Sequence, residues 1–131
     1  MPLQVELVSP ERILLSVEAT MVRARTIGGG DIAFLPGHSS LIGALDTWTV
    51  DIRPVEGAPI LAAVHGGFIS INHDNVKILS NLAELADQVD VARAEAAAEQ
   101  AEATIRAQDD AEAQAALARA HARLRAAGVL V

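Results

Sequence analysis

A histidine followed by two serines, His38, Ser39 and Ser40, is the first candidate for chemistry in this chain. Histidine activates serine in nucleophilic catalysis, and the Pro-Gly corner in the stretch FLPGHSSLIG is a turn of the kind that often carries functional side chains. Catalysis also needs partners, but the chain has no GxSxG elbow and no motif that places a carboxylate to orient the imidazole. The sequence therefore favours a turn or contact role for His38, with no catalytic residue.

The remaining histidines and the glycine run do not predict a metal or phosphate site. His65, His73 and His121 are scattered and have neither HxxxH nor HExxH spacing. The glycines at 28–30 precede neither Lys-Ser nor Lys-Thr, as a P-loop requires, so we interpret them as a loop tip. No metal site is expected.

Carboxylates and an arginine around position 88 form a third group. Glu84, Asp87 and Asp90 stand at helical or near-helical spacing, and Arg93 follows Asp90 by three residues. By themselves these residues are typical of the N-cap and first turn of a helix, with Arg93 as the i, i+3 partner of Asp90. A role in ligand binding depends on the elements that position them.

The composition limits the possible functions. A chain of 131 residues can form one domain with a real core and a short appendage. Hydrophobic residues make up 51% of it but aromatic residues only 2%, which predicts an aliphatic core with few rings for ligand stacking. The net charge of −7 argues against nucleic acid and acidic membrane surfaces, because both bind chiefly Lys and Arg.

Three absences favour a soluble, cytoplasmic protein. The chain has no cysteine, which excludes disulfides and thiolate chemistry. Its start, MPLQVELVSPERILLS, lacks the basic and long apolar regions of a signal peptide. No uncharged apolar run approaches the ~20 residues that cross a bilayer, so no direct membrane insertion is expected.

Up to residue 86, apolar and polar side chains alternate with period two. LQVELV, WTVDI, FISIN and NVKIL show this pattern, which is typical of half-buried strands, and Trp48 is expected to be partly buried. A hairpin turn is expected at 72–75, and Gly66-Gly67 is interpreted as a bulge or a close approach of strands. Short strands without helices between them favour an antiparallel sandwich or barrel.

From about residue 88 the composition becomes helical. Glycine and proline are absent until Gly128, and alanine and glutamate dominate. Two stripes step by three and four residues, and Gln108-Asp109-Asp110 between them offers a turn and an N-cap. The sequence predicts an antiparallel hairpin, with glutamates on the first helix paired to arginines on the second. The stripes are Val91, Ala94, Ala98, Ala101 and Ile105, and Ala113, Leu117, Ala120, Leu124 and Ala127.

The alanine stripes predict a weakly held hairpin. Alanine buries little apolar area, so each contact contributes much less than the ~1.5 to 3 kcal/mol of a buried Leu or Ile. The hairpin should be marginal alone. Both a moving arm and a permanently docked helical cap are compatible with this pattern.

Four segments, taken in order, match the pattern of one known family. They are SPERILLS after the opening strand, GDIAFLPGHSSLIGAL, HGGFISI followed by NVKIL, and VDVARA leading into the alanine-rich hairpin. On these residues, nearly the whole chain resembles the epsilon subunits of bacterial F-type ATP synthases. The resemblance implies a flattened antiparallel β-sandwich of about ten strands over 1–86 and a two-helix C-terminal hairpin over 87–131.

The resemblance also implies a non-catalytic rotor subunit of a proton-translocating ATP synthase, with no required cofactor. The sandwich would sit between the gamma subunit and the c-ring, peripheral to the cytoplasmic face of the bacterial inner membrane. His38 would lie on the surface that contacts gamma, and Asp31 in the loop that meets the c-ring. The hairpin would either fold against the sandwich or extend toward the alpha and beta subunits and block ATP hydrolysis.

Many members of this family bind ATP without hydrolysing it, which favours the folded hairpin. The associated motif is Ile or Leu, Asp, two variable residues, Arg and Ala, and it reads VDVARA at 89–94. Guanidiniums can pair with phosphates, and carboxylates can accept hydrogen bonds from adenine or ribose. The residues that the resemblance implies for regulatory ATP binding are Glu84, Asp90, Arg93, Ala94, Arg119 and Arg123.

Departures from the family pattern bear on these expectations. Ala33 replaces a glycine and LDTW replaces a Lys-Pro-Gly turn near residue 47, and both concern loop shape. Gln100 stands where some ATP-binding members have another arginine, which predicts weaker ATP binding or none. Two alternatives also stand: a free-standing ATP-binding sensor without a rotor role, and an enzyme of unknown type built on His38.

Overall fold

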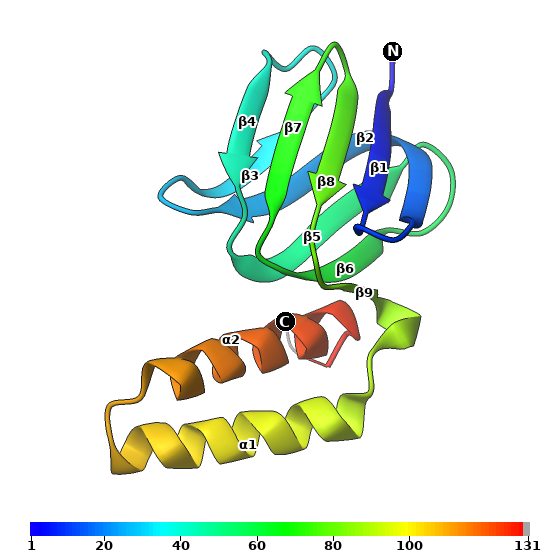
Figure 1. Ribbon diagram of the computed structural model, residues 1–131. Coiled ribbons are helices and arrows are strands. Elements are labelled where there is room, and N and C mark those ends of the chain that lie inside the picture. The colour runs from blue at the N-terminus through cyan, green and yellow to red at the C-terminus, as the bar shows by residue number, and fades with distance from the viewer. Residues whose placement is uncertain (130–131) are drawn as a thin grey trace.

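A computed structural model describes residues 1–129 as a β-sandwich with a helical hairpin beneath it (Figure 1). The expected fold is confirmed, with nine strands in these residues against about ten in the family pattern. A 3-10 turn, η1 (Ala86–Gln88), leads from the sandwich into α1 (Val91–Ala107) and α2 (Ala111–Ala126). The strands are β1 (Leu3–Val8), β2 (Ile13–Thr26), β3 (Gly30–Phe34), β4 (Leu41–Ala44), β5 (Thr47–Pro54), β6 (Ile60–His65), β7 (Phe68–Asn72), β8 (Asn75–Leu79) and β9 (Ala83–Leu85).

The long strand β2 belongs to both layers of the sandwich. The strand order is β4-β7-β8-β1-β2-β5-β6-β9, and β3 pairs with β2 off this path. The N-terminal half of β2 pairs with β1 and its C-terminal half with β3 and β5, with a register shift between Ala19 and Met21. The strand pairs are antiparallel apart from β1 and β8, which run parallel with Val5 opposite Val76.

Two turn predictions are confirmed. β7 and β8 form the expected hairpin through His73 and Asp74, whose φ angles of 50° and 64° are both positive, as a two-residue type I′ turn requires. Gly67 has a φ of 120°, and a Cβ at this position would overlap the carbonyl of Leu79. The close approach of these strands therefore requires glycine.

The period-two residues fill one core between the layers. Leu3, Val5 and Leu7 of β1 are fully buried, as the alternation in LQVELV predicts. Within the buried core of residues 1–129, Phe34 supplies the only aromatic ring, so the core is aliphatic as expected. Trp48 is half-buried, which is also as expected.

The hairpin forms from the predicted caps and stripes. The Asp90 carboxylate accepts a hydrogen bond from the Arg93 backbone N–H at the start of α1, and the Asp110 carboxylate accepts one from Ala113 at the start of α2. The seam between the helices buries Ala94, Ala98, Ala120 and Leu124, with Val91 and Leu117 packed against them. The two helices therefore meet along small side chains.

The hairpin is folded onto the sandwich. α2 lies between α1 and the sandwich and contacts β5 and β6 (Figure 1). Ala122 and Ala126 of α2 are buried against Ala63 of β6. In the part of the chain that the structure describes, neither helix has the length and apolar character to span a bilayer.

Candidate functional site

A pocket of about 380 Å³ lies where β9 and η1 meet the facing surfaces of α1 and α2. The chain reaches it from three sides: an edge strand, the N-terminal turn of α1 and the middle of α2. All six residues expected from the family motif line it. They are Glu84, Asp90, Arg93, Ala94, Arg119 and Arg123, joined by Gln88, Ala97 and Ala116.

Local structure explains this convergence. Glu84 of β9 pairs in register with Ala63 of β6, which holds its carboxylate at the sheet edge beside α2. Arg119 and Arg123 are one turn apart on α2 and therefore share a face. The small side chains Ala97 and Ala116 leave space between the helices. The pocket is thus a consequence of the alanine seam.

Two of the pocket's arginines hold carboxylates of this chain. Arg123 Nε donates to Glu84 Oε1 at 2.6 Å, and Arg119 Nη2 donates to Glu112 Oε1 at 2.7 Å. Among the ion pairs within residues 1–129, none involves the Arg93 side chain. An anion would therefore displace no carboxylate at Arg93, but would have to compete for the other two guanidiniums.

Asp90 acts as a helix cap in this structure. Its Oδ1 accepts a hydrogen bond from the Arg93 backbone N–H at 3.1 Å, which confirms the interpretation of Asp90 as an acidic residue at the start of a helix. Gln100 lies outside the main pocket and lines a neighbouring hollow of about 300 Å³, which shares Ala97 and Ala116 with it. The two hollows adjoin along the helix seam, so an arginine at position 100 would stand at the far edge of the pocket.

Sequence reasoning missed His65, which lies behind the pocket. Its side chain is 4% exposed, and its Nε2 lies 3.3 Å from the Glu84 Oε1 atom that Arg123 also contacts. Its Nδ1 is buried and has no hydrogen-bond partner among the described residues. Burial, and then the positive charge of Arg123, lower the pKa of His65 below its ordinary value of 6.5, although the hydrogen bond to Glu84 opposes this.

A second polar contact holds α2 to the sandwich, and the sequence analysis did not find it. Arg125 binds both carboxylate oxygens of Asp51 on β5, at 2.8 and 3.1 Å, and also donates to Thr49. Its guanidinium lies 5.4 Å from the ring centroid of Trp48. The only signal for this contact was the excess of arginines at the end of α2.

The expected pairing of α1 glutamates with α2 arginines is wrong. Arg119 pairs within its own helix, and Arg123 and Arg125 pair with the sandwich. Between the helices, His121 Nε2 approaches Glu102 only to 4.0 Å. Arg123 and Arg125 reach the sandwich because α2 lies between it and α1.

Asp31 and His38 lie away from the pocket. Asp31, near the start of β3, forms a two-point contact with Arg25, and this guanidinium lowers the pKa of the carboxyl. The His38 ring packs edge-on against the Phe34 ring, with 5.0 Å between the two ring centroids. The Nδ1 atom of His38 lies 2.7 Å from the Ser39 carbonyl oxygen. The Ser40 hydroxyl donates to Asn72 instead of contacting His38. This arrangement gives no support to serine activation.

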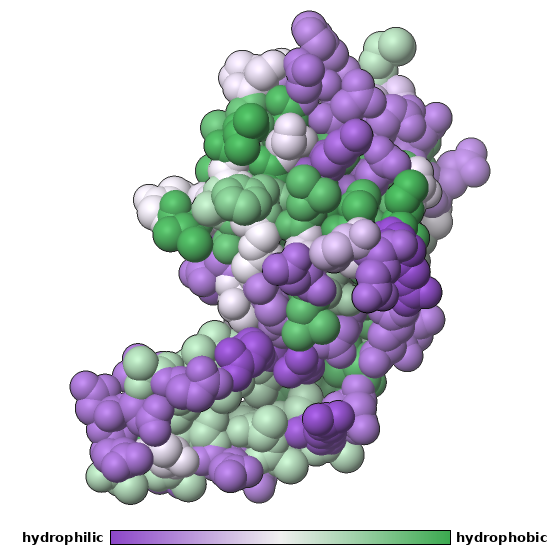
Figure 2. Space-filling view, viewed as in Figure 1, coloured by the Kyte–Doolittle hydropathy of each residue, from purple (hydrophilic) through white to green (hydrophobic). Residues whose placement is uncertain are grey.

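An apolar row crosses the outer face of one layer. Strand register aligns Ala44, Phe68, Leu79, Val8 and Ile13 across five strands. Phe68, Leu79 and Ile13 are 56%, 47% and 57% exposed. Figure 2 shows the green surface that runs across β4, β7 and β8. An exposed apolar row of this length is typical of a protein-contact surface.

Comparison with known proteins identifies the family. Residues 2–86 match the family model described as ATP synthase, Delta/Epsilon chain, beta-sandwich domain. The ATP synthase epsilon chain of Streptomyces griseus is 50% identical over 127 residues, which are 97% of this chain and 96% of that protein. This chain belongs to the ATP synthase epsilon chain family. The proteins of that name from Streptomyces coelicolor and Thermobifida fusca are each 46% identical, covering 95% and 94% of this chain and 94% and 90% of their own lengths.

The fold of this epsilon chain also occurs in a solved assembly. A chain in the cryo-EM structure of the Euglena gracilis mitochondrial ATP synthase, described as OSCP/F1/c-ring in rotational state 1, superposes with a TM-score of 0.81 at 22% identity. The match covers 96% of this chain and 81% of that chain, so sandwich and hairpin both take part. The folded arrangement of sandwich and hairpin therefore also occurs in that chain.

Proposed function

We propose that this epsilon chain is a non-catalytic central-stalk subunit of a proton-translocating ATP synthase, and that its hairpin regulates ATP hydrolysis. The observation that carries the proposal is the nature of the contact between hairpin and sandwich: small alanines and two ion pairs hold α2 to the sandwich. Such a contact is weak enough to be exchanged for another. Folded, the hairpin permits turnover; extended toward the alpha and beta subunits, it blocks ATP hydrolysis.

The sandwich has exposed surfaces that could form permanent contacts with the other subunits of the rotor. The apolar row through Phe68 and Leu79 supports a protein contact, which we assign to the gamma subunit. His38 lies beside the turn between β7 and β8, at the other end of these strands, and its assignment to the gamma contact follows from the family resemblance. Asp31 is half-exposed next to the glycine loop and is assigned to the c-ring contact. The complex would then hold this subunit at the cytoplasmic face of the bacterial inner membrane as a peripheral component.

We further propose that the pocket binds ATP as a regulatory ligand. Three guanidiniums converge on a volume in the range of small-molecule sites, about 300 to 1,000 Å³. Bound ATP would hold β9, α1 and α2 together and so favour the folded hairpin. Free ATP at 100 times its dissociation constant would stabilise this state by about 2.7 kcal/mol.

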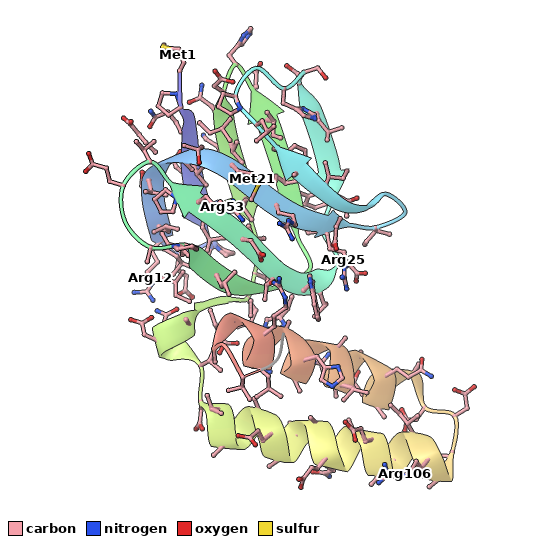
Figure 3. The ribbon with its side chains drawn as sticks, turned by 180° about the vertical axis from the view of Figure 1, so that it is seen from behind. Met1, Arg12, Met21, Arg25, Arg53 and Arg106 are labelled. Atoms are coloured by element: carbon pink, nitrogen blue, oxygen red, sulfur yellow. The ribbon has the colours of Figure 1, made fainter. Side chains whose placement is uncertain are left out.

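Calorimetric titration of ATP, with and without magnesium, tests the regulatory site. The isolated chain should bind, and the Arg93→Ala, Arg119→Ala double variant should not. Arg106→Ala is the matched control, because Arg106 lies at the far end of α1 from the pocket (Figure 3) and should leave binding unchanged. If the native chain fails to bind at millimolar ATP, the regulatory site is refuted and the rotor proposal stands.

Truncation after residue 88 tests the inhibitory arm. The shortened chain should still assemble with the rest of the enzyme, and the ATPase activity of the complex should rise. Unchanged activity would rule out inhibition by the hairpin. The alternative of a free-standing ATP sensor has one observation in its favour, since the pocket lies entirely within this chain; co-purification with gamma would reject it.

A further inference from the structure

The indole ring of Trp48 lies next to two arginines that come from different parts of the molecule. Trp48 of β5 has the Arg25 guanidinium 4.3 Å from its ring centroid and that of Arg125 at 5.4 Å. Arg25 belongs to β2, and Figure 3 shows it at the end of the sandwich that faces the hairpin. Arg125 belongs to the last turn of α2. The ring of Trp48 therefore joins strand β2, which pairs with Asp31 of β3, to the docked helix α2.

Each of these arginines has its own carboxylate. Arg25 contacts both oxygens of Asp31, at 2.9 and 3.3 Å, and Arg125 contacts both oxygens of Asp51, at 2.8 and 3.1 Å. Two cations on one ring repel each other, and a two-point carboxylate contact on each offsets this repulsion. Loss of either carboxylate contact would leave part of this repulsion without compensation.

The two carboxylates differ in their access to other molecules. The Asp51 side chain is 17% exposed and lies under α2, whereas the Asp31 side chain is 47% exposed at the start of β3. A cationic group on another molecule can therefore take the Asp31 carboxylate from Arg25. Arg25 would then repel Arg125 across Trp48 and compete with it for the ring and for Asp51.

We propose that Asp31, Arg25, Trp48 and Arg125 form a relay through which loss of the Asp31 charge loosens α2 from the sandwich. The relay connects the exposed start of β3 with the hairpin, over residues that do not line the pocket. It operates whether or not the pocket takes ATP. The contact between Arg123 and Glu84 is separate from it and remains, so the relay changes the docking equilibrium by a modest factor.

Hydrogen exchange on the full-length chain tests the relay. Asp31→Asn keeps the shape of the side chain and removes its charge. We expect the α2 amides at 119–126 to exchange about two- to fivefold faster in this variant, the range of a partly exposed charge interaction. Amides of β7 and β8 should keep their native exchange rates. The effect should shrink in 1 M salt, because salt screens charges at the surface.

A double variant separates the relay from a local effect of Asp31. If Arg25 transmits the effect of Asp31→Asn, its removal should cancel that effect. The α2 amides of the Arg25→Gln, Asp31→Asn double variant should therefore exchange at the same rate as those of Arg25→Gln alone. Asp74→Asn is the matched control, since Asp74 is an aspartate in the turn between β7 and β8, at the end of the sandwich opposite α2 (Figure 1). It should leave the α2 amides at the native rate.

Trp48 fluorescence gives an independent readout, because Trp48 is the single tryptophan of the chain. Its emission should shift in Asp31→Asn and not in Asp74→Asn. The relay is refuted if the α2 amides of Asp31→Asn exchange at the native rate. It is also refuted if Asp31→Asn speeds exchange equally with and without Arg25, or if Asp74→Asn has the same effect.

Discussion

The sandwich and the hairpin are stabilised in different ways. The sandwich buries large aliphatic side chains completely, with Leu3, Ile52 and Ile78 among those with no exposed area. The hairpin buries mainly alanines, and its contact with the sandwich relies on Arg123 and Arg125. Burial of large side chains gives one packed state, whereas ion pairs can change partners. The comparison indicates a rigid part and an exchangeable part in one chain.

Truncation in the sandwich core should have the largest effect. Ile78→Ala should lower the free energy of unfolding by about 2 to 5 kcal/mol, because it leaves a cavity among fully buried neighbours. Leu117→Ala at the half-buried helix seam should cost about 1 kcal/mol or less. Urea unfolding of both variants measures this. Equal losses would contradict the division into a rigid and an exchangeable part.

Removal of Arg125 should weaken docking without harming the sandwich. Arg125→Ala removes the guanidinium from Asp51 and Thr49, which keep the hydrogen bond from the Thr49 hydroxyl to Asp51, and it removes the contact with Trp48. We expect a loss of about 1 to 2 kcal/mol in docking free energy, since the cluster is partly open to water. Hydrogen exchange of α2 and of β7 reports the two parts separately, with Arg106→Ala as control. Faster exchange in β7 as well would show that the parts are coupled.

Acid should undock the hairpin before it unfolds the sandwich. The pKa of His65 is lowered in the docked state by burial and by Arg123, so the undocked state binds more protons as the pH falls. The contribution of His65 to docking is therefore fully present above its ordinary pKa of 6.5 and is lost as the pH falls from there through the lowered pKa. Amide exchange of α2 between pH 7.5 and 5 measures this. His65→Gln should remove the pH dependence of α2 exchange. If the pH dependence persists in that variant, other titratable groups cause it.

The smallest effect should come from the exposed pair of the pocket. Glu112 is 78% exposed, so Glu112→Gln should change stability by about 0.5 kcal/mol or less. The same change releases Arg119 and should strengthen ATP binding modestly, as measured by calorimetry. A large loss of stability would mean that this pair holds the hairpin, and that docking does not depend on Arg123 and Arg125 alone.

Much of the candidate site could be predicted, but from the family motif rather than from spacing. VDVARA, the upstream Glu84 and the later arginines pointed to six residues that line one pocket. Spacing alone indicated helix caps, and Asp90 does cap α1. His65 could not be found in this way, because a single histidine at the end of a strand carries no pattern. Its contact with Glu84 depends on the pairing of β6 with β9, and Arg123 of α2 reaches the same carboxylate oxygen.

The sequence by itself determined the local structure of this protein. Alternation set the strands, the Asn-His-Asp-Asn stretch set the turn at 73–74, and aspartates set the helix starts, because each of these depends on neighbours in the chain. Only the tertiary structure decided the parallel pairing of β1 with β8 and the partners of the α2 arginines. Arg125 and Asp51 are 74 residues apart, and many carboxylates could have paired with this arginine. Packing of α2 against β5 and β6 selected one of them, since only packing brings distant residues within reach.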